Sequence, residues 1–216
     1  MKKYNVLILF TFIIIAILIK IDNVNGALPL VGKTIIIDSG HGGVDPGAVY
    51  NNINEKDINL NIAKSLQNDL IKLGATVLMT REGDYDLSSP NTTWRKASDF
   101  DNRISYINNS KADMYISIHM NFLNNSIYKG TQVFYNSDES KILANLIQKE
   151  INKNYNYEKE IKKIPTHTYM YSKLNITGVL LEAGFISNYE DRKNFSNKSY
   201  LNKYTKIISQ AIIKFY

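Results

Sequence analysis

The chain has 216 residues, no cysteine and a formal net charge of +6. The lack of cysteine excludes disulfides and thiolate metal sites, so the fold must rely on an apolar core, for which 44% hydrophobic residues are sufficient. The positive charge either favours an anionic environment or simply reflects a composition rich in lysine. The lysines are scattered and form no basic stripe interleaved with aromatic residues, so we expect no nucleic-acid partner.

The amino terminus has the pattern of an export signal, in which Met1–Lys3 precedes an apolar run over residues 6–19. A helix of that length would reach about 21 Å, less than the bilayer core of about 30 Å, which favours a signal peptide over a span. Gly26 and Ala27 match a cleavage site poorly. Residues 1–26 are therefore predicted to be either a cleaved signal peptide or a retained membrane anchor. Both alternatives place the rest of the chain outside the cytoplasm, secreted or held at the outer face of the membrane.

Residues 27–216 have a length typical of one domain and contain no linker-like segment or internal repeat. Their apolar pattern alternates between strand-like and helix-like segments, which implies an α/β fold with a mostly parallel twisted sheet and helices on both faces. Strands are expected at 34–37, 76–79, 114–118, 131–135 and 178–181, and helices at 55–73, around 103–107, at 141–151 and at 201–215.

Several predicted strands end close to residues that could bind a metal or transfer a proton. His41 follows the first strand, His119 closes the strand at 114–118, and Glu182 closes the strand at 178–181. Glu55 lies in the first turn of the helix after the His41 loop, so its carboxylate can point back over the same edge. Ligands of parallel sheets bind at the carboxyl ends of the strands, so we expect these four groups to converge there.

Two imidazoles and one carboxylate match a catalytic zinc site, which takes three nitrogen or oxygen ligands and leaves one position open for water. The glycines that flank His41 allow the backbone to turn sharply beside a ligand. The remaining carboxylate could then serve as a general base near the activated water.

Each residue also has a plainer interpretation. His41 could belong to a phosphate-binding loop, although no Lys-Ser/Thr pair follows it. His119 could be a core histidine, and Glu55 could simply favour the helix dipole. Glu182 is harder to explain in this way, because an acid at the end of an apolar strand is costly unless it is used. His167 lies in a polar stretch and is predicted to be a surface residue.

A series of ordered motifs extends over residues 34–214. They comprise 36–43 with Asp45 and Gly47, Glu55, Thr80–Arg81, Asn102–Arg103, 117–121 and 181–188. By these motifs the chain resembles the zinc-dependent N-acetylmuramoyl-L-alanine amidases of the type 3 class. The resemblance implies that His41, Glu55 and His119 bind Zn2+ and that Glu182 is the catalytic carboxylate. The implied reaction is hydrolysis of the amide between the lactyl group of muramic acid and L-alanine in peptidoglycan.

The small size and the single apolar N-terminal segment resemble most the sporulation amidases, which prepare spore cortex peptidoglycan for muramic-δ-lactam formation. Some members of the family require an activator protein, so a partner of that kind is a further expectation. Two alternatives stay open: a catalytically inactive peptidoglycan-binding module of the same fold, and a zinc peptidase or deacetylase. The second is disfavoured because the chain has only three histidines and no H-E-x-x-H motif.

Overall fold

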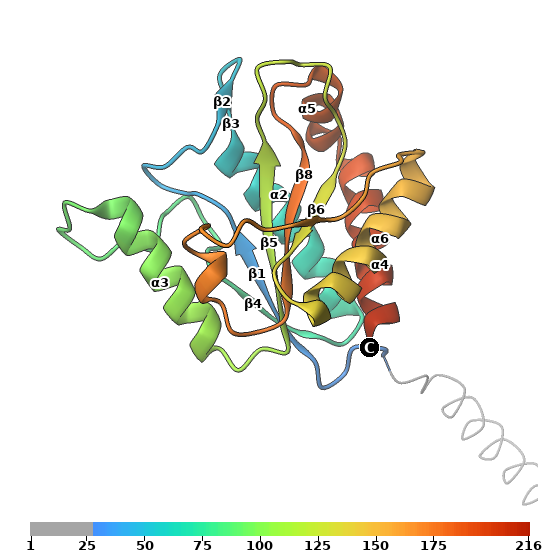
Figure 1. The fold of residues 1–216 in the computed structure, drawn as a ribbon, viewed down its shortest axis with the longest axis horizontal. Helices are drawn as coiled ribbons and strands as arrows, with labels where there is room; N and C mark the ends of the chain where they lie inside the picture. The colour runs from blue at the N-terminus through green and yellow to red at the C-terminus, as the bar shows by residue number, and fades with distance from the viewer. Residues whose placement is uncertain (1–27) are drawn as a thin grey trace, which may run out of the picture.

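The computed structural model describes residues 28–216, so the predicted signal peptide or anchor at residues 1–26 lies outside the described residues. A six-stranded sheet in the order β4-β1-β5-β8-β6-β7 forms the centre of the fold (Figure 1). Its strands are β1 Thr34–Ser39, β4 Thr76–Met79, β5 Met114–Asn121, β6 Gln132–Tyr135, β7 Lys162–Lys163 and β8 Gly178–Phe185.

The four strands β4, β1, β5 and β8 run parallel, whereas β6 is antiparallel to β8 and β7 is parallel to β6. Strand β1 is buried on both faces, since Ile35 and Ile37 belong to one hydrophobic cluster and Ile36 to another. An unbroken run of β-branched residues is the pattern that a strand covered on both sides requires. The predicted mostly parallel sheet is confirmed.

Helices cover both faces of the sheet, as the sequence predicts. Helices α2, α4 and α6 pack against one face and against one another, and α3 lies on the other face with the segment 164–174 (Figure 1). The helices are α2 Glu55–Lys72, α3 Arg95–Asn109, α4 Asp138–Tyr155, the 3₁₀ helix η1 Tyr171–Lys173, α5 Tyr189–Ser196 and α6 Lys198–Phe215. Among residues 28–216, no helix is long and apolar enough to cross a membrane.

The sequence did not predict several features of the fold. Helix α3 is longer than its apolar pattern indicates, a short hairpin forms from β2 Val49–Tyr50 and β3 Ile53–Asn54, and α5 occupies a stretch expected to be a loop. Strand β7 and the helix η1 were not expected either. Asn188 caps the start of helix α5, and its side chain accepts a hydrogen bond from the backbone N–H of Asp191. The Asp191 carboxylate in turn accepts bonds from the backbone of Gly130 and Phe185, so this helix depends on contacts distant in sequence.

The parallel strands β1, β5 and β8 end on one side of the sheet, which we call the carboxyl edge, and begin on the other, the amino edge. Helix α2 starts at the carboxyl edge, because the short loop and the β2–β3 hairpin after β1 stay on that side (Figure 1). The fold thus brings the ends of β1, β5 and β8 and the first turn of α2 into one region.

Candidate metal centre

The loop after β1 carries His41 in a left-handed backbone conformation with φ of 62°. Two buried guanidinium groups hold this loop by its carbonyl oxygens. Arg81 donates to the oxygens of Ser39 and Gly40, both at 3.0 Å. Arg103 donates to the oxygens of Ser39 at 2.9 Å and His41 at 2.7 Å. The unfavourable conformation of His41 is thus fixed by contacts from elsewhere in the chain.

The charge of Arg103 is balanced inside the protein. Its guanidinium donates to Asp38 at 2.7 Å and to Asp99 at 2.8 Å, and Asp38 is fully buried. Burial alone would raise the pKa of Asp38, but Arg103 and a hydrogen bond from Ser117 lower it below its usual value. The carboxylate therefore stays charged and keeps Arg103 in position beneath the His41 loop.

His119 projects from β5 toward the same loop and lies directly beside Gly40. A Cβ atom added to Gly40 would come within 2.3 Å of Cε1 and Nε2 of the His119 ring. Gly40 has no positive φ, so the reason for glycine here is the close approach of an imidazole rather than backbone conformation.

Glu55 is the first residue of α2, and its side chain lies between the two histidines. Its Oε1 atom is 3.1 Å from Nε2 of His41 and 3.0 Å from Nδ1 of His119. The backbone N–H groups of Met120 and Ala48 donate to its two carboxylate oxygens at 3.1 and 2.9 Å. These bonds fix the direction of the carboxylate. Glu55 as a whole is buried, with 4% of its surface exposed.

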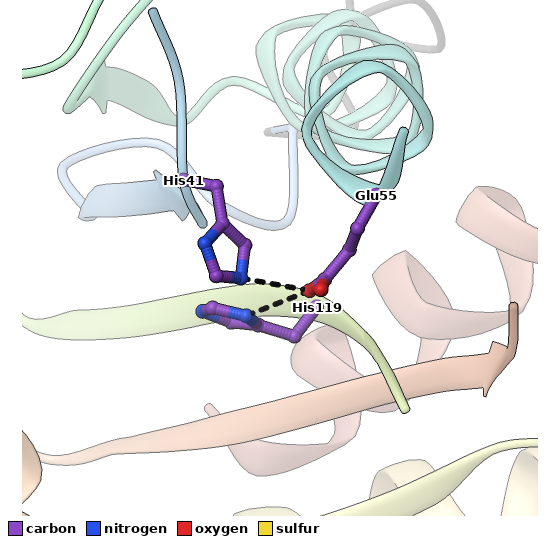
Figure 2. A group of neighbouring side chains, drawn as sticks. All are labelled: His41, Glu55 and His119. Atoms are coloured by element: carbon purple, nitrogen blue, oxygen red, sulfur yellow. Dashed lines mark hydrogen bonds and ion pairs between the residues drawn. The ribbon is translucent and has the colours of Figure 1, made fainter. Parts of the chain in front are cut away.

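One donor atom from each of His41, Glu55 and His119 lies within 4.8 Å of the others. Figure 2 shows both imidazole rings directed toward the Glu55 carboxylate, and the ring centroids are 4.9 Å apart. Two imidazole nitrogens and one carboxylate oxygen form the donor set that zinc prefers at catalytic sites. The residues therefore fit a divalent metal ion, and the structure brings these three side chains together at the carboxyl edge.

Asp45 contributes a contact that sequence reasoning missed. Its Oδ2 lies 2.9 Å from Nδ1 of His41, while Nε2 of the same ring faces Glu55. Carboxylates commonly bind the outward nitrogen of a metal-ligating histidine, fixing its tautomer and orientation. The spacing of four residues between His41 and Asp45 was a visible signal, but the turn that joins them was not.

The charges of this cluster stabilise one another. Burial alone would lower the pKa of His41, but hydrogen bonds to Asp45 and Glu55 raise it to about 9. The hydrogen bond to His41 lowers the pKa of Asp45 to about 2. Burial opposes the charged form of Glu55, yet His119 and His41 hold the pKa of Glu55 far below its usual value. Protons and a metal ion would therefore compete for the same imidazole nitrogens in this cluster.

Glu182 lies beside this group on β8, in register with His119 on β5. Its Oε2 atom is enclosed and has no hydrogen-bond partner. Burial raises the pKa of Glu182 to about 7, with an opposing influence of His119 and a further upward contribution from Glu55. A carboxyl group with a raised pKa beside a candidate metal site is a candidate for proton transfer.

A cavity of about 150 Å³ opens next to the two histidines. Its opposite wall is formed by Phe100 of α3 and by the segment Thr168–Tyr171. His167 immediately precedes this segment and is exposed, in agreement with its prediction as a surface residue. The cavity provides space for a substrate group beside the candidate metal ligands.

Comparison with known proteins matches residues 35–214 to the family model described as N-acetylmuramoyl-L-alanine amidase. The germination-specific N-acetylmuramoyl-L-alanine amidase of Bacillus subtilis is 36% identical over 220 residues, covering 96% of this chain and 92% of that protein. The amidase LytC of Bacillus subtilis is 31% identical over 195 residues, which cover 87% of this chain but only 36% of LytC.

Solved structures agree with this match. The CwlD amidase of Clostridioides difficile, determined in complex with the GerS lipoprotein, superposes with a TM-score of 0.80 at 37% identity, covering 85% of this chain and 98% of that one. An N-acetylmuramoyl-L-alanine amidase of Clostridium difficile 630 gives a TM-score of 0.74 at 29% identity, covering 85% and 96%. The family match spans most of the chain and includes every residue of the candidate centre, so the protein belongs to the N-acetylmuramoyl-L-alanine amidase family.

Proposed function

We propose that this peptidoglycan amidase uses a zinc ion held by His41, Glu55 and His119, and that Glu182 is its catalytic base. The observation that carries the proposal is the donor set itself, because atoms of all three residues lie within 4.8 Å of one another. The support of His41 by Asp45 adds to it, since a metal-ligating histidine is typically held in this way.

A bound zinc ion would polarise the scissile carbonyl and make a water molecule more acidic. Glu182 would take a proton from the attacking water, a step that requires its charged form, which a bound cation favours. The water oxygen bonds to the lactyl carbonyl carbon, the carbon–nitrogen bond breaks, and the proton held by Glu182 passes to the nitrogen of L-alanine. The products are a free lactyl carboxyl group and a stem peptide with a free amino terminus.

Digestion of purified peptidoglycan tests this function. Zinc-loaded protein should release stem peptides with free L-alanine amino termini, detected by mass spectrometry, and leave glycan strands with free lactyl groups. Glu182→Gln should lower this release by about 100-fold or more while retaining about one equivalent of zinc. Products cut within the stem peptide or deacetylated sugars would instead identify a peptidase or a deacetylase. Intact muropeptides with both zinc-loaded and partner-supplemented protein would favour an inactive binding module.

We also propose that the chain acts outside the cytoplasm. Support comes from the sequence of residues 1–26, which has the basic start and the apolar core that a signal peptide or a membrane anchor requires. Residues 27–216 then form the zinc amidase domain. A role in spore cortex maturation is consistent with the similarity to a germination-specific amidase.

An activator protein is a further part of the proposal. The similar CwlD amidase was solved in complex with the GerS lipoprotein, which supports the idea that this chain also works with a partner. The proposal predicts that zinc content or turnover of the purified protein rises when such a lipoprotein is added. If zinc content and turnover stay unchanged at a saturating concentration of the lipoprotein, the activator proposal is wrong. The proposed zinc ligands would not be affected by that result.

A further inference from the structure

The described chain begins at the amino edge with a segment that is docked firmly onto α2. The backbone N–H of Leu30 donates to the oxygen of Leu73 at 2.9 Å, and the oxygen of Lys33 accepts from Thr76 at 2.8 Å. The side chain of Leu30 is fully buried in the main core. This segment is therefore part of the folded unit, and its exposed side chains have fixed positions.

Apolar side chains of this region nevertheless face solvent. Leu28 is 50% exposed, Val31 is 63% exposed, and Ile71 in the last turn of α2 is 51% exposed. Leu28 and Val31 pack over Gly74, where an added Cβ would meet each of them at 2.8 Å. Gly74 bonds through its backbone N–H to the oxygen of Ile71, so the last turn of α2, which carries Ile71, adjoins this contact.

Positive charge borders these residues. Lys72 is exposed beside Ile71, and Nζ of Lys33 lies 4.1 Å from the ring centroid of Tyr216. The carboxylate of the nearby Asp113 accepts a hydrogen bond from the backbone N–H of Thr34 at 2.7 Å. We call the group formed by Leu28, Val31, Ile71, Lys33 and Lys72 the amino-edge patch. Apolar side chains with lysines at their border are typical of proteins that rest on an anionic lipid surface.

The position of the amino-edge patch in the chain indicates that it faces a membrane. It lies where the chain continues into residues 1–27, and residues 6–19 are the apolar run. The segment 20–27 spans at most about 28 Å even when fully extended, so an apolar run within a bilayer keeps the patch close to the membrane. Figure 1 shows the blue start of the described chain and the C-terminus at the end opposite the β2–β3 hairpin.

We propose that the amino-edge patch lies against the anionic outer surface of the cytoplasmic membrane and directs the carboxyl edge, with its metal ligands, away from the lipid. The length of β1 alone separates the two edges by about 20 Å. The domain then presents its site toward the cell wall and works on peptidoglycan above the membrane. This inference rests on the proposed export of the chain, with residues 1–26 retained as a membrane anchor.

Single-cysteine probes can test the orientation directly because the chain has no cysteine. Four variants of the full chain are made: Val31→Cys and Ile71→Cys in the patch, Ser126→Cys at the carboxyl edge, and Gln210→Cys on the exposed side of α6. All four positions are exposed. Each variant is reconstituted in vesicles of phosphatidylcholine with or without phosphatidylglycerol, and its outward-facing fraction is labelled with a membrane-impermeant maleimide.

Labelling at positions 31 and 71 should slow by about fivefold or more when phosphatidylglycerol is present, the change expected for one lysine near an anionic surface. Positions 126 and 210 should label at the same rate in both kinds of vesicle. In the Val31→Cys background, Lys72→Gln should weaken the protection by about fivefold, while the matched change Lys64→Gln on the same helix should leave it unchanged.

Equal labelling at all four positions, or protection at 126 or 210 instead of 31 and 71, would overturn the proposal. Protection that does not depend on phosphatidylglycerol or on Lys72 would also overturn it, because the charged border would then have no role. The readout does not involve hydrolysis or zinc, so its failure is distinct from failure of the amidase mechanism.

Discussion

The backbone of His41 is left-handed, with φ of 62°, a conformation that residues with a side chain adopt infrequently. Such a conformation costs roughly 1–3 kcal/mol and persists only where its surroundings impose it. Arg81 and Arg103 provide these surroundings through the carbonyl oxygens of the loop. The glycines around His41 indicated a sharp turn, but the two arginines come from distant segments, and their contacts could not be deduced from spacing.

The carboxylate of Asp45 offers a test of how His41 is held. Asp45→Asn keeps the size of the side chain but removes the charge that fixes the ring, so zinc affinity should fall by about 10- to 100-fold. Zinc titration against a competing chelator measures this change. Asp57→Asn, an exposed aspartate in the first turn of α2, is the control and should leave affinity unchanged. Equal affinity of Asp45→Asn and the parent would refute a supporting role for Asp45.

The enclosed carboxyl of Glu182 predicts a pH dependence. Its pKa is raised to about 7 without a metal, and a bound cation favours the charged form and lowers the pKa again. A base must be deprotonated, so kcat/KM should fall as pH decreases, with a midpoint below about 7. Glu182→Gln should lower kcat by about 100-fold or more with zinc retained. Loss of zinc in this variant would show that Glu182 is a ligand instead.

At the scale of elements, the sequence predicted most of what positions the site. Local periodicity was sufficient to predict three elements: the strand at 34–37, the helix with a four-residue repeat from Ile58 to Leu70, and the strand before His119. Helix α5 and the direction of β6 depend instead on partners far along the chain, such as Gly130, which donates to the Asp191 carboxylate. Local patterns do not contain that information.

The packing of β5 against the β1 loop makes Gly40 a further test. Gly40→Ala should displace the His119 ring, since the new methyl group would lie 2.3 Å from it. Overpacking of this kind typically costs about 1–3 kcal/mol, so the variant should fold but bind zinc weakly. Gly83→Ala is the matched control, because its nearest contact is the half-exposed ring of Tyr85 at 3.2 Å. Unchanged zinc binding by Gly40→Ala would contradict the predicted position of His119.

At the scale of the whole molecule, the proposed metal ligands lie on the loop after β1, on α2 and on β5, which are different parts of the chain. A bound ion should therefore stabilise the entire fold. At zinc concentrations 100 times the Kd, the free energy of unfolding should rise by about 2.7 kcal/mol. For a domain of this size that corresponds to an increase in Tm of about 5–10 °C. Calorimetry with and without chelator measures the difference, and identical Tm values at saturating zinc would contradict this coupling.

The central claim is that two imidazoles and one carboxylate share a single zinc ion. X-ray absorption spectroscopy of the zinc-loaded protein tests it most directly. We predict about one equivalent of zinc with imidazole scattering from two ligands at about 2.0–2.1 Å, and reduced imidazole scattering in His41→Ala and in His119→Ala. A zinc spectrum without histidine ligands, or one that neither substitution changes, would contradict the account.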